Sequence, residues 1–153
     1  MADVLCFAPP SARYVLRGRT AALLELATGL QFPRKLGGMR DGVAMLGPDE
    51  WLALLPEGSR LPMGEDQPVS VVDVSNRSVG IIVEGSQAVD ILSAGCPLDL
   101  AHWPIGRVSR TIFELVEIVL IREADMRFRV EVWRSFAPWL MEALEAAANA
   151  LAA

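Results

Sequence analysis

The sequence predicts an α+β fold in which helices cover one face of an antiparallel sheet. Residues 127–133 alternate between two kinds of side chain, with Phe128, Val130 and Val132 on one side and charged residues on the other. This period of two is typical of a half-buried strand. Residues 136–151 repeat apolar side chains at helical spacing, which indicates a helix packed along one stripe. Short turns separate the other β-rich segments, as in antiparallel sheets.

The first half of the chain is expected to hold one helix among short strands. Thr20 is a suitable N-cap for a helix over Ala21–Thr28, and Gly29 can adopt the left-handed conformation that ends it. Pro48 presets a turn between the last two strands of this half. These strands are expected at Tyr14–Leu16, Val43–Leu46 and Trp51–Leu55.

A linker is expected over Pro56–Pro68, because its prolines and glycines interrupt any regular element. It separates two halves, at about 1–60 and 69–153. A chain of 153 residues fits a single domain over 1–153 with its own core.

The second half is expected to hold two helices. Ser86 is the expected N-cap of a helix over Gln87–Ala94, which stops at Gly95. Ser135 is the expected N-cap of the closing helix, with Pro138 in its first turn. The strands of this half are expected at Val71–Val74, Val79–Val83, Val108–Glu114, Val116–Arg122 and Arg127–Trp133. The packing stripe of the closing helix is expected to be Phe136, Trp139, Leu140, Ala143, Leu144, Ala147 and Leu151.

The two halves share an order of elements. Each runs from a strand through a capped helix and a closing glycine, Gly29 or Gly95, to a turn with proline, Pro33 or Pro97, and then to paired strands. This order predicts two pseudo-repeated halves that arose by internal duplication.

Composition and charge exclude several classes of partner. The net charge is -5 and the pI is about 4.9, without a basic run, so nucleic acid is not an expected partner. The longest apolar run, residues 111–121, falls short of the roughly 20 residues that cross a membrane. The start of the chain lacks the features of a signal peptide, so a cytoplasmic location is expected. Hydrophobic residues make up 52%, which favours a partner that covers some of them.

The residues that most often carry chemistry are sparse. Cys96 follows a helix C-terminus, where the dipole does not activate a thiol, so a packed structural role is expected. His102 has no sequence-adjacent carboxylate partner, and a surface position is expected. Two cysteines and one histidine do not suggest a zinc site. No glycine-rich phosphate loop is present, so no cofactor is expected to bind this chain.

Four motifs resemble one protein family. They are Gly-Pro-Asp-Glu-Trp-Leu at 47–52, Asp-Val-Ser-Asn-Arg at 73–77, Gly-Cys-Pro-Leu-Asp-Leu at 95–100 and Glu-Val-Trp-Arg-Ser-Phe-Ala-Pro-Trp at 131–139. In this order they resemble the gamma subunit of heterotetrameric sarcosine oxidase. The second motif is also similar to one in the folate-binding aminomethyltransferases of the glycine cleavage system. The resemblance implies the fold of that aminomethyltransferase (T-protein) domain.

The resemblance implies a subunit of an oxidoreductase that demethylates sarcosine. It implies FAD, FMN, NAD and tetrahydrofolate in the partner subunits, and the other subunits of sarcosine oxidase as partners. No catalysis by this chain alone is expected. The aspartate in an Asn-Ala motif on which the aminomethyltransferases are thought to rely has no counterpart here, where Glu131–Arg134 stands. Asp73 is expected only to begin a turn that Ser75 and Arg77 close.

The candidate partner interface is Trp133, Arg134, Phe136 and Trp139. A guanidinium flanked by aromatic rings can stack on them and bind a carboxylate of a partner. The alternative for Arg134 is an intramolecular ion pair with Glu131. Tryptophan and arginine are also the residues that dominate interface energetics.

Two other functions are compatible with the residues. One is a stand-alone folate-binding protein for one-carbon transfer, against which the short length and the missing catalytic motif stand. The other is a degenerate homologue that only self-associates. The apolar composition makes a homodimer of the isolated chain credible under each interpretation.

Overall fold

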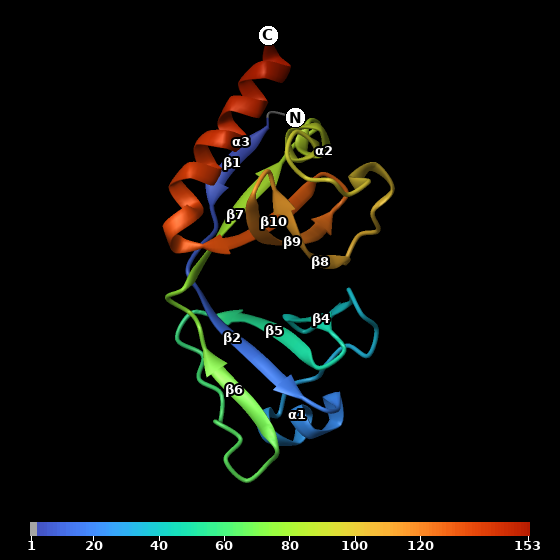
Figure 1. Cartoon of the computed structure of the whole chain (residues 1–153), viewed down its shortest axis with the longest axis vertical. Helices are drawn as coiled ribbons and strands as arrows, with labels where there is room; N and C mark the ends of the chain where they lie inside the picture. The colour runs from blue at the N-terminus through green and yellow to red at the C-terminus, as the bar shows by residue number, and fades with distance from the viewer. Residues whose placement is uncertain (1–2) are drawn as a thin grey trace. The chain divides into compact units, whose positions relative to one another are not determined.

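The computed structural model describes residues 3–153, which form two compact units (Figure 1). Within these residues, unit 1 comprises residues 3–9 and Arg77–Ala153, and unit 2 comprises Pro10–Asn76. Met1 and Ala2, on which the expectation about a signal peptide partly rests, lie outside the described residues. The expectation of a single domain over 1–153 stays a prediction.

Unit 2 is a five-stranded antiparallel sheet with one helix. The strands follow the order β3-β4-β5-β2-β6. The elements are β2 Ser11–Gly18, α1 Ala21–Thr28, β3 Met39–Arg40, β4 Val43–Gly47, β5 Glu50–Pro56 and β6 Val69–Asp73.

Helix α1 begins and ends at the residues that the sequence predicts. The Thr20 side chain accepts a hydrogen bond from the Leu23 amide at 3.3 Å, and Gly29 has φ 75°. The helix covers the face of the sheet on which Leu16 pairs in register with Trp51 of β5 and Val71 of β6. The core of unit 2 consists of Ala12, Tyr14, Leu16, Ala21, Leu24, Phe32, Val43, Trp51, Ala53 and Val71.

Unit 1 is a second five-stranded antiparallel sheet, with the order β1-β7-β10-β9-β8. Two helices and two short 3₁₀ helices, η1 and η2, accompany it. The elements are β1 Val4–Phe7, β7 Ser78–Glu84, α2 Ala88–Ser93, η1 Leu100–His102, β8 Val108–Phe113, β9 Val116–Ala124, β10 Arg127–Trp133, η2 Arg134–Phe136 and α3 Ala137–Ala152.

The helices of unit 1 pack on one face of their sheet. In register, Val130 of β10 lies between Ile81 of β7 and Leu120 of β9, and all three are buried. Ile91 of α2 and Leu140 of α3 belong to the same apolar core. This confirms the predicted fold class, an α+β arrangement with helices on one face of antiparallel sheet.

The predicted N-cap of α2 is wrong. Ser86 is not the N-cap; Gln87 takes that position without a side-chain cap. The Gln87 amide instead donates to Asp3 Oδ1 at 3.0 Å, so a residue distant in sequence satisfies this helix end. Gly95 does not have the positive φ of a left-handed cap. It is required because a Cβ there would lie 2.8 Å from the Phe113 ring.

The start and the stripe of α3 also differ from the prediction. Ser135 lies in the 3₁₀ turn η2, and Phe136 is the N-cap without a side-chain bond. Pro138 does lie at the first helical positions, as expected. Leu140 and Leu144 are buried, while Phe136, Trp139 and Leu151 are exposed. The packing stripe is therefore rotated away from these three apolar residues.

Each sheet contains a strand from the other half of the chain. β1 precedes β2 in sequence but pairs with β7, and β6 precedes β7 but pairs with β2. The strand orders then match throughout, with β3, β4, β5, β2 and β6 corresponding to β8, β9, β10, β7 and β1. An internal duplication predicts this shared order, and we keep the duplication as a proposal.

Candidate partner interface

The predicted interface residues lie where β10 passes through η2 into α3. Trp133 is the last residue of β10, and Phe136 ends the 3₁₀ turn that follows. Side chains three residues apart eclipse each other in a 3₁₀ helix and are neighbours in an α-helix, so Trp133, Phe136 and Trp139 share one side. We call these three residues the aromatic cluster.

The aromatic cluster is exposed in the isolated chain. The exposed fractions are 51% for Trp133, 46% for Phe136 and 40% for Trp139. Ala137, Leu140 and Leu144 occupy the buried side of the same segment, so the fold fills its core without these rings. Neighbouring exposed aromatic side chains mark interaction surfaces, because a domain gains little from leaving them in water.

Arg77 is part of the same surface. Its guanidinium carbon lies 5.5 Å from the centroid of the Trp133 ring, within the range of a cation–π contact. The Arg134 amide donates to the Arg77 carbonyl at 2.8 Å, which ties the start of η2 to the segment before β7. The sequence did not indicate this contact, because it depends on the register of Trp133 opposite Ser78.

Arg134 itself is exposed at the start of the 3₁₀ turn. Glu131, its alternative partner, accepts a hydrogen bond from Arg129 Nε at 2.7 Å, and only 3% of the Glu131 side chain is exposed. This ion pair lies over Gly80, where a Cβ would stand 2.9 Å from Glu131 Oε1. The pairing of Arg134 with Glu131 stays a prediction.

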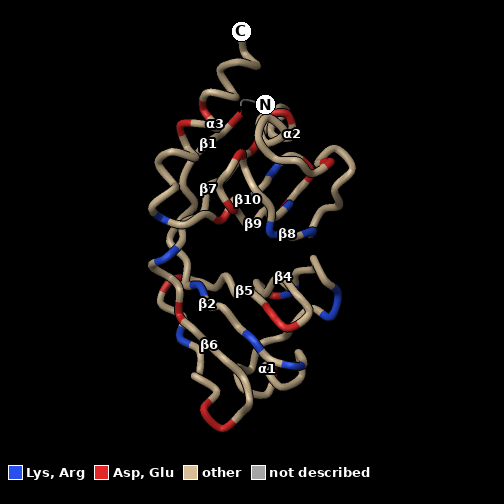
Figure 2. Tube along the Cα trace, in the orientation of Figure 1, with Lys and Arg blue, Asp and Glu red and all other residues tan. Residues whose placement is uncertain are grey.

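The charge near the cluster is positive, although the chain as a whole is acidic. Residues 132–141 contain Arg134 and no carboxylate, and Arg77 adds a second guanidinium. In Figure 2 the trace between β10 and α3 accordingly carries blue. A partner surface with apolar hollows and nearby carboxylates would complement it.

The motif at 73–77 forms a turn rather than a reactive site. Asp73 Oδ1 accepts a hydrogen bond from the Ser75 amide at 2.9 Å, and Ser75 Oγ accepts one from the Arg13 amide at 2.9 Å. The Ser75 hydroxyl and amide lower the pKa of the Asp73 carboxyl. The predicted turn-closing role of Ser75 is confirmed, whereas Arg77 contacts Trp133 instead.

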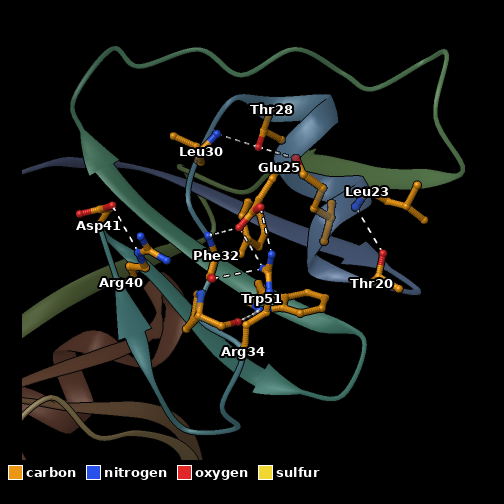
Figure 3. A network of polar contacts seen from close by, with 12 residues as sticks. Thr20, Leu23, Glu25, Thr28, Leu30, Phe32, Arg34, Arg40, Asp41 and Trp51 are labelled. Carbon is orange, nitrogen blue, oxygen red and sulfur yellow. Dashed lines mark hydrogen bonds and ion pairs between the residues drawn. The ribbon is translucent and has the colours of Figure 1, made fainter.

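The motif at 47–52 anchors a loop on α1 (Figure 3). Trp51 is buried, packs edge-on against Phe32 with ring centroids 5.7 Å apart, and donates from Nε1 to the Pro33 carbonyl at 3.3 Å. Glu25 of α1 binds Arg34 through both carboxylate oxygens, at 2.9 and 3.0 Å, and accepts the Phe32 amide at 3.0 Å. The Arg34 and Phe32 hydrogen bonds lower the pKa of Glu25.

The motif at 95–100 is structural too. Cys96 is buried, as expected. His102 is exposed, as expected, and its Nδ1 lies 2.8 Å from Oδ2 of Asp99, a contact that the sequence did not indicate. Sequence reasoning missed Arg122, whose Nη1 donates to the Leu100 carbonyl at 3.0 Å and to the Trp103 carbonyl.

The model of the "Sarcosine oxidase, gamma subunit family" matches residues 17–150. The chain belongs to this family. It is 34% identical over 145 residues to the sarcosine oxidase subunit gamma of Arthrobacter sp., with 83% of this chain and 70% of that protein covered. It is 33% identical over 145 residues to the subunit gamma of Corynebacterium sp. (strain P-1), with the same shares covered.

A solved structure shares the fold. The heterotetrameric sarcosine oxidase from Corynebacterium sp. U-96, in complex with pyrrole 2-carboxylate, contains a chain that matches with a TM-score of 0.85 and 25% identity. The match covers 99% of this chain and 86% of the other.

Two general features of this family member can be stated for the described residues. Over residues 3–153, no group of three or more His, Cys, Asp and Glu side chains is arranged to hold a metal ion. None of the helices in this part of the chain combines the length and the apolar character needed to span a membrane.

Proposed function

We propose that this chain is the gamma subunit of a heterotetrameric sarcosine oxidase and that it docks on its partner subunits through Trp133, Arg134, Phe136 and Trp139. Membership of the gamma subunit family supports the subunit role, as does the likeness to a chain of a solved heterotetrameric enzyme. The exposure of the three rings is the observation that carries the docking surface.

The docking surface fits a partner that offers apolar pockets beside carboxylates. Burying the indoles of Trp133 and Trp139 removes large apolar areas from water, which is the main source of binding energy at such sites. Arg77 and Arg134 can then bind carboxylates at the edge of the contact. Arg77 already contacts the Trp133 ring and so limits its freedom before docking.

The chain acts in this proposal as a folded, non-catalytic surface that supports assembly. FAD, FMN, NAD and tetrahydrofolate are held by the partner subunits, where sarcosine is demethylated and its one-carbon unit is passed on. The cytoplasmic location expected from the sequence stays a prediction.

Co-purification tests this proposal. The chain is expressed with the large subunits of the same operon or genome, one of which carries an affinity tag. We expect the wild-type chain to be retained, and the double variant Trp133→Ser/Trp139→Ser to be lost from the complex. Leu115→Ser is the matched control, because Leu115 is 96% exposed and lies outside the aromatic cluster. Retention of the double variant at the wild-type level would exclude this surface, and failure of the wild type to co-purify would exclude the subunit role.

The stand-alone folate-binding alternative has a separate test. The isolated chain is titrated with a reduced folate and heat release is measured. We expect no saturable binding, because the Asp73 carboxylate already accepts a hydrogen bond from Ser75 within its own turn. Saturable binding in the micromolar range would favour the alternative.

A further inference from the structure

Strand β1 is a short edge strand whose own residues lack the charges and prolines that often prevent pairing. It lies at the end of the unit 1 sheet, next to β7. Its residues are Val4, Leu5, Cys6 and Phe7, without a charged residue or proline. Natural edge strands normally carry lysine, proline or a bulge, because an uncovered edge pairs with other chains. The sequence did not predict this strand, and the proposed docking surface does not include it.

The backbone groups of β1 have known directions. The Ala8 amide donates to the Gly80 carbonyl at 2.8 Å, and Cys6 stands opposite Ile82 in register. Antiparallel ladders alternate, so Cys6 and Ala8 direct their backbone groups toward β7, while Leu5 and Phe7 direct theirs away from it. Within residues 3–153, neither Leu5 nor Phe7 makes a backbone hydrogen bond beyond its own ladder. Their outward amides and carbonyls form an open row.

We propose that, in the chain free of its partner subunits, a second copy of this chain adds to this row as an antiparallel strand centred on Cys6. In that register Leu5 stands opposite Phe7 of the second copy, and Phe7 opposite its Leu5. In each such pair, each residue donates its amide to the carbonyl of the other, because both residues direct their backbone groups away from β7. A two-fold axis through the centre makes the contact self-complementary and closed, which is the common form of homodimer.

The side chains support a second copy as the occupant. Phe7 is 52% exposed and Val4 is 43% exposed. In the proposed register Phe7 packs across from Leu5, and Val4 packs across from Ala8, so each exposed apolar side chain gains an apolar cross-strand neighbour. Because the strand is uncharged, no like charges oppose one another when it pairs with itself.

The register also brings the two copies of Cys6 together. Cys6 would face Cys6 of the second copy in a pair without mutual hydrogen bonds, for which the Cα atoms are typically about 4.5 Å apart. A disulfide can bridge this separation. Cys6 is an exposed free thiol, and Cys96 is buried, so Cys6 is the reactive reporter.

Cross-linking of the purified full chain tests the register. Diamide accepts two electrons and two protons as two Cys6 thiols become a disulfide. We expect rapid formation of a covalent dimer with the wild type. In a Cys6→Ser background, Phe7→Cys and Val4→Cys each place a thiol at an exposed position that does not face its own counterpart in the second copy. Their cross-linking should be at most about one tenth as fast. Equal rates at all three positions would show random collision and overturn the proposal.

Light scattering under reducing conditions tests the contact without a disulfide. We expect a dimer whose dissociation constant rises about tenfold in Leu5→Pro, which removes an outward amide of each copy and leaves the β7 ladder in place. Phe7→Lys should weaken it similarly, and far-ultraviolet circular dichroism verifies that each variant is folded. Phe136→Ser should leave the dimer unchanged. A chain that stays monomeric at every concentration, or a dimer lost only in Phe136→Ser, would contradict the proposal.

Discussion

The Arg77 guanidinium lies over the ring of Trp133, with 5.5 Å between its carbon and the ring centroid, although 56 residues of sequence separate the two. The contact joins the start of one strand to the end of its neighbour, since Trp133 pairs with Ser78. It holds one ring of the aromatic cluster at the surface and places a positive charge beside it. The proposed docking surface therefore has a fixed part before any partner binds.

Replacing Arg77 with alanine should weaken the proposed assembly and slightly destabilise the chain. The lost cation–π contact is worth about 0.5–1 kcal/mol at an exposed site. We expect a small decrease in the urea midpoint, a change in tryptophan fluorescence and a larger decrease in affinity for the partner subunits. Arg107→Ala, at another exposed arginine of unit 1, is the control. Equal effects of the two variants on affinity would show that only general charge matters.

Gly95→Ala should destabilise unit 1 through a steric conflict. The new Cβ would lie 2.8 Å from the buried Phe113 ring, and overpacking of this kind costs about 1–3 kcal/mol. Phe113→Leu in the same chain should recover part of the loss. Gly47→Ala is the control, because its Cβ would meet only Glu50 Cβ at 3.7 Å. Denaturant unfolding measures all three, and a neutral Gly95→Ala would contradict the packing described for the motif at 95–100.

Acid should weaken the loop that Glu25 anchors. Hydrogen bonds from Arg34 and Phe32 lower the pKa of Glu25 below its usual 4.5. A lowered pKa in the folded state means that this contribution to stability is complete above about pH 4.5 and is lost as the pH falls through the lowered value. We expect Glu25→Gln to remove this part of the pH dependence in thermal unfolding at pH 3–7. Glu57→Gln, at an exposed carboxylate without an ion pair in the described part of the chain, should leave it unchanged. Identical profiles for the two variants would count against the role of Glu25.

Two fragments of the chain should fold only together. The fragment 1–60 contains β1 but lacks β6, the partner of β2, and the fragment 69–153 contains β6 but lacks β1, the partner of β7. Each alone would leave a sheet without its end strand, and each would carry an unpaired strand. We expect co-expressed fragments to co-purify and show cooperative unfolding. Independent, cooperative folding of either fragment would show that its sheet does not need the strand contributed by the other fragment.

Local signals were sufficient for some elements and not for others. The ends of α1 could be predicted because Thr20 and Gly29 act on their own neighbours. The caps assigned to Ser86 and Ser135 were wrong, since Asp3 bonds to the Gln87 amide and a 3₁₀ turn precedes α3. β1 was missed because β7, the strand with which it pairs, lies far away in the sequence.

In the candidate site, too, local signals predicted some features and missed those that depend on contacts distant in sequence. Aromatic content and spacing indicated the cluster, and the structure leaves its rings exposed. The sequence nevertheless assigned Phe136 and Trp139 to the packing stripe as well, because periodicity does not define which side of a helix faces the core. Arg77 was missed as a neighbour of Trp133, since only the strand register brings them together.

Side-chain oxidation by hydroxyl radicals, read by mass spectrometry, tests the central claim most directly. The isolated chain and the chain in the assembled enzyme are labelled side by side. The account predicts that Trp133, Phe136 and Trp139 are oxidised in the isolated chain and strongly protected in the complex, while Trp51, buried within unit 2, is protected in both. Oxidation of the three rings at the same rate in the complex as in the isolated chain would contradict it.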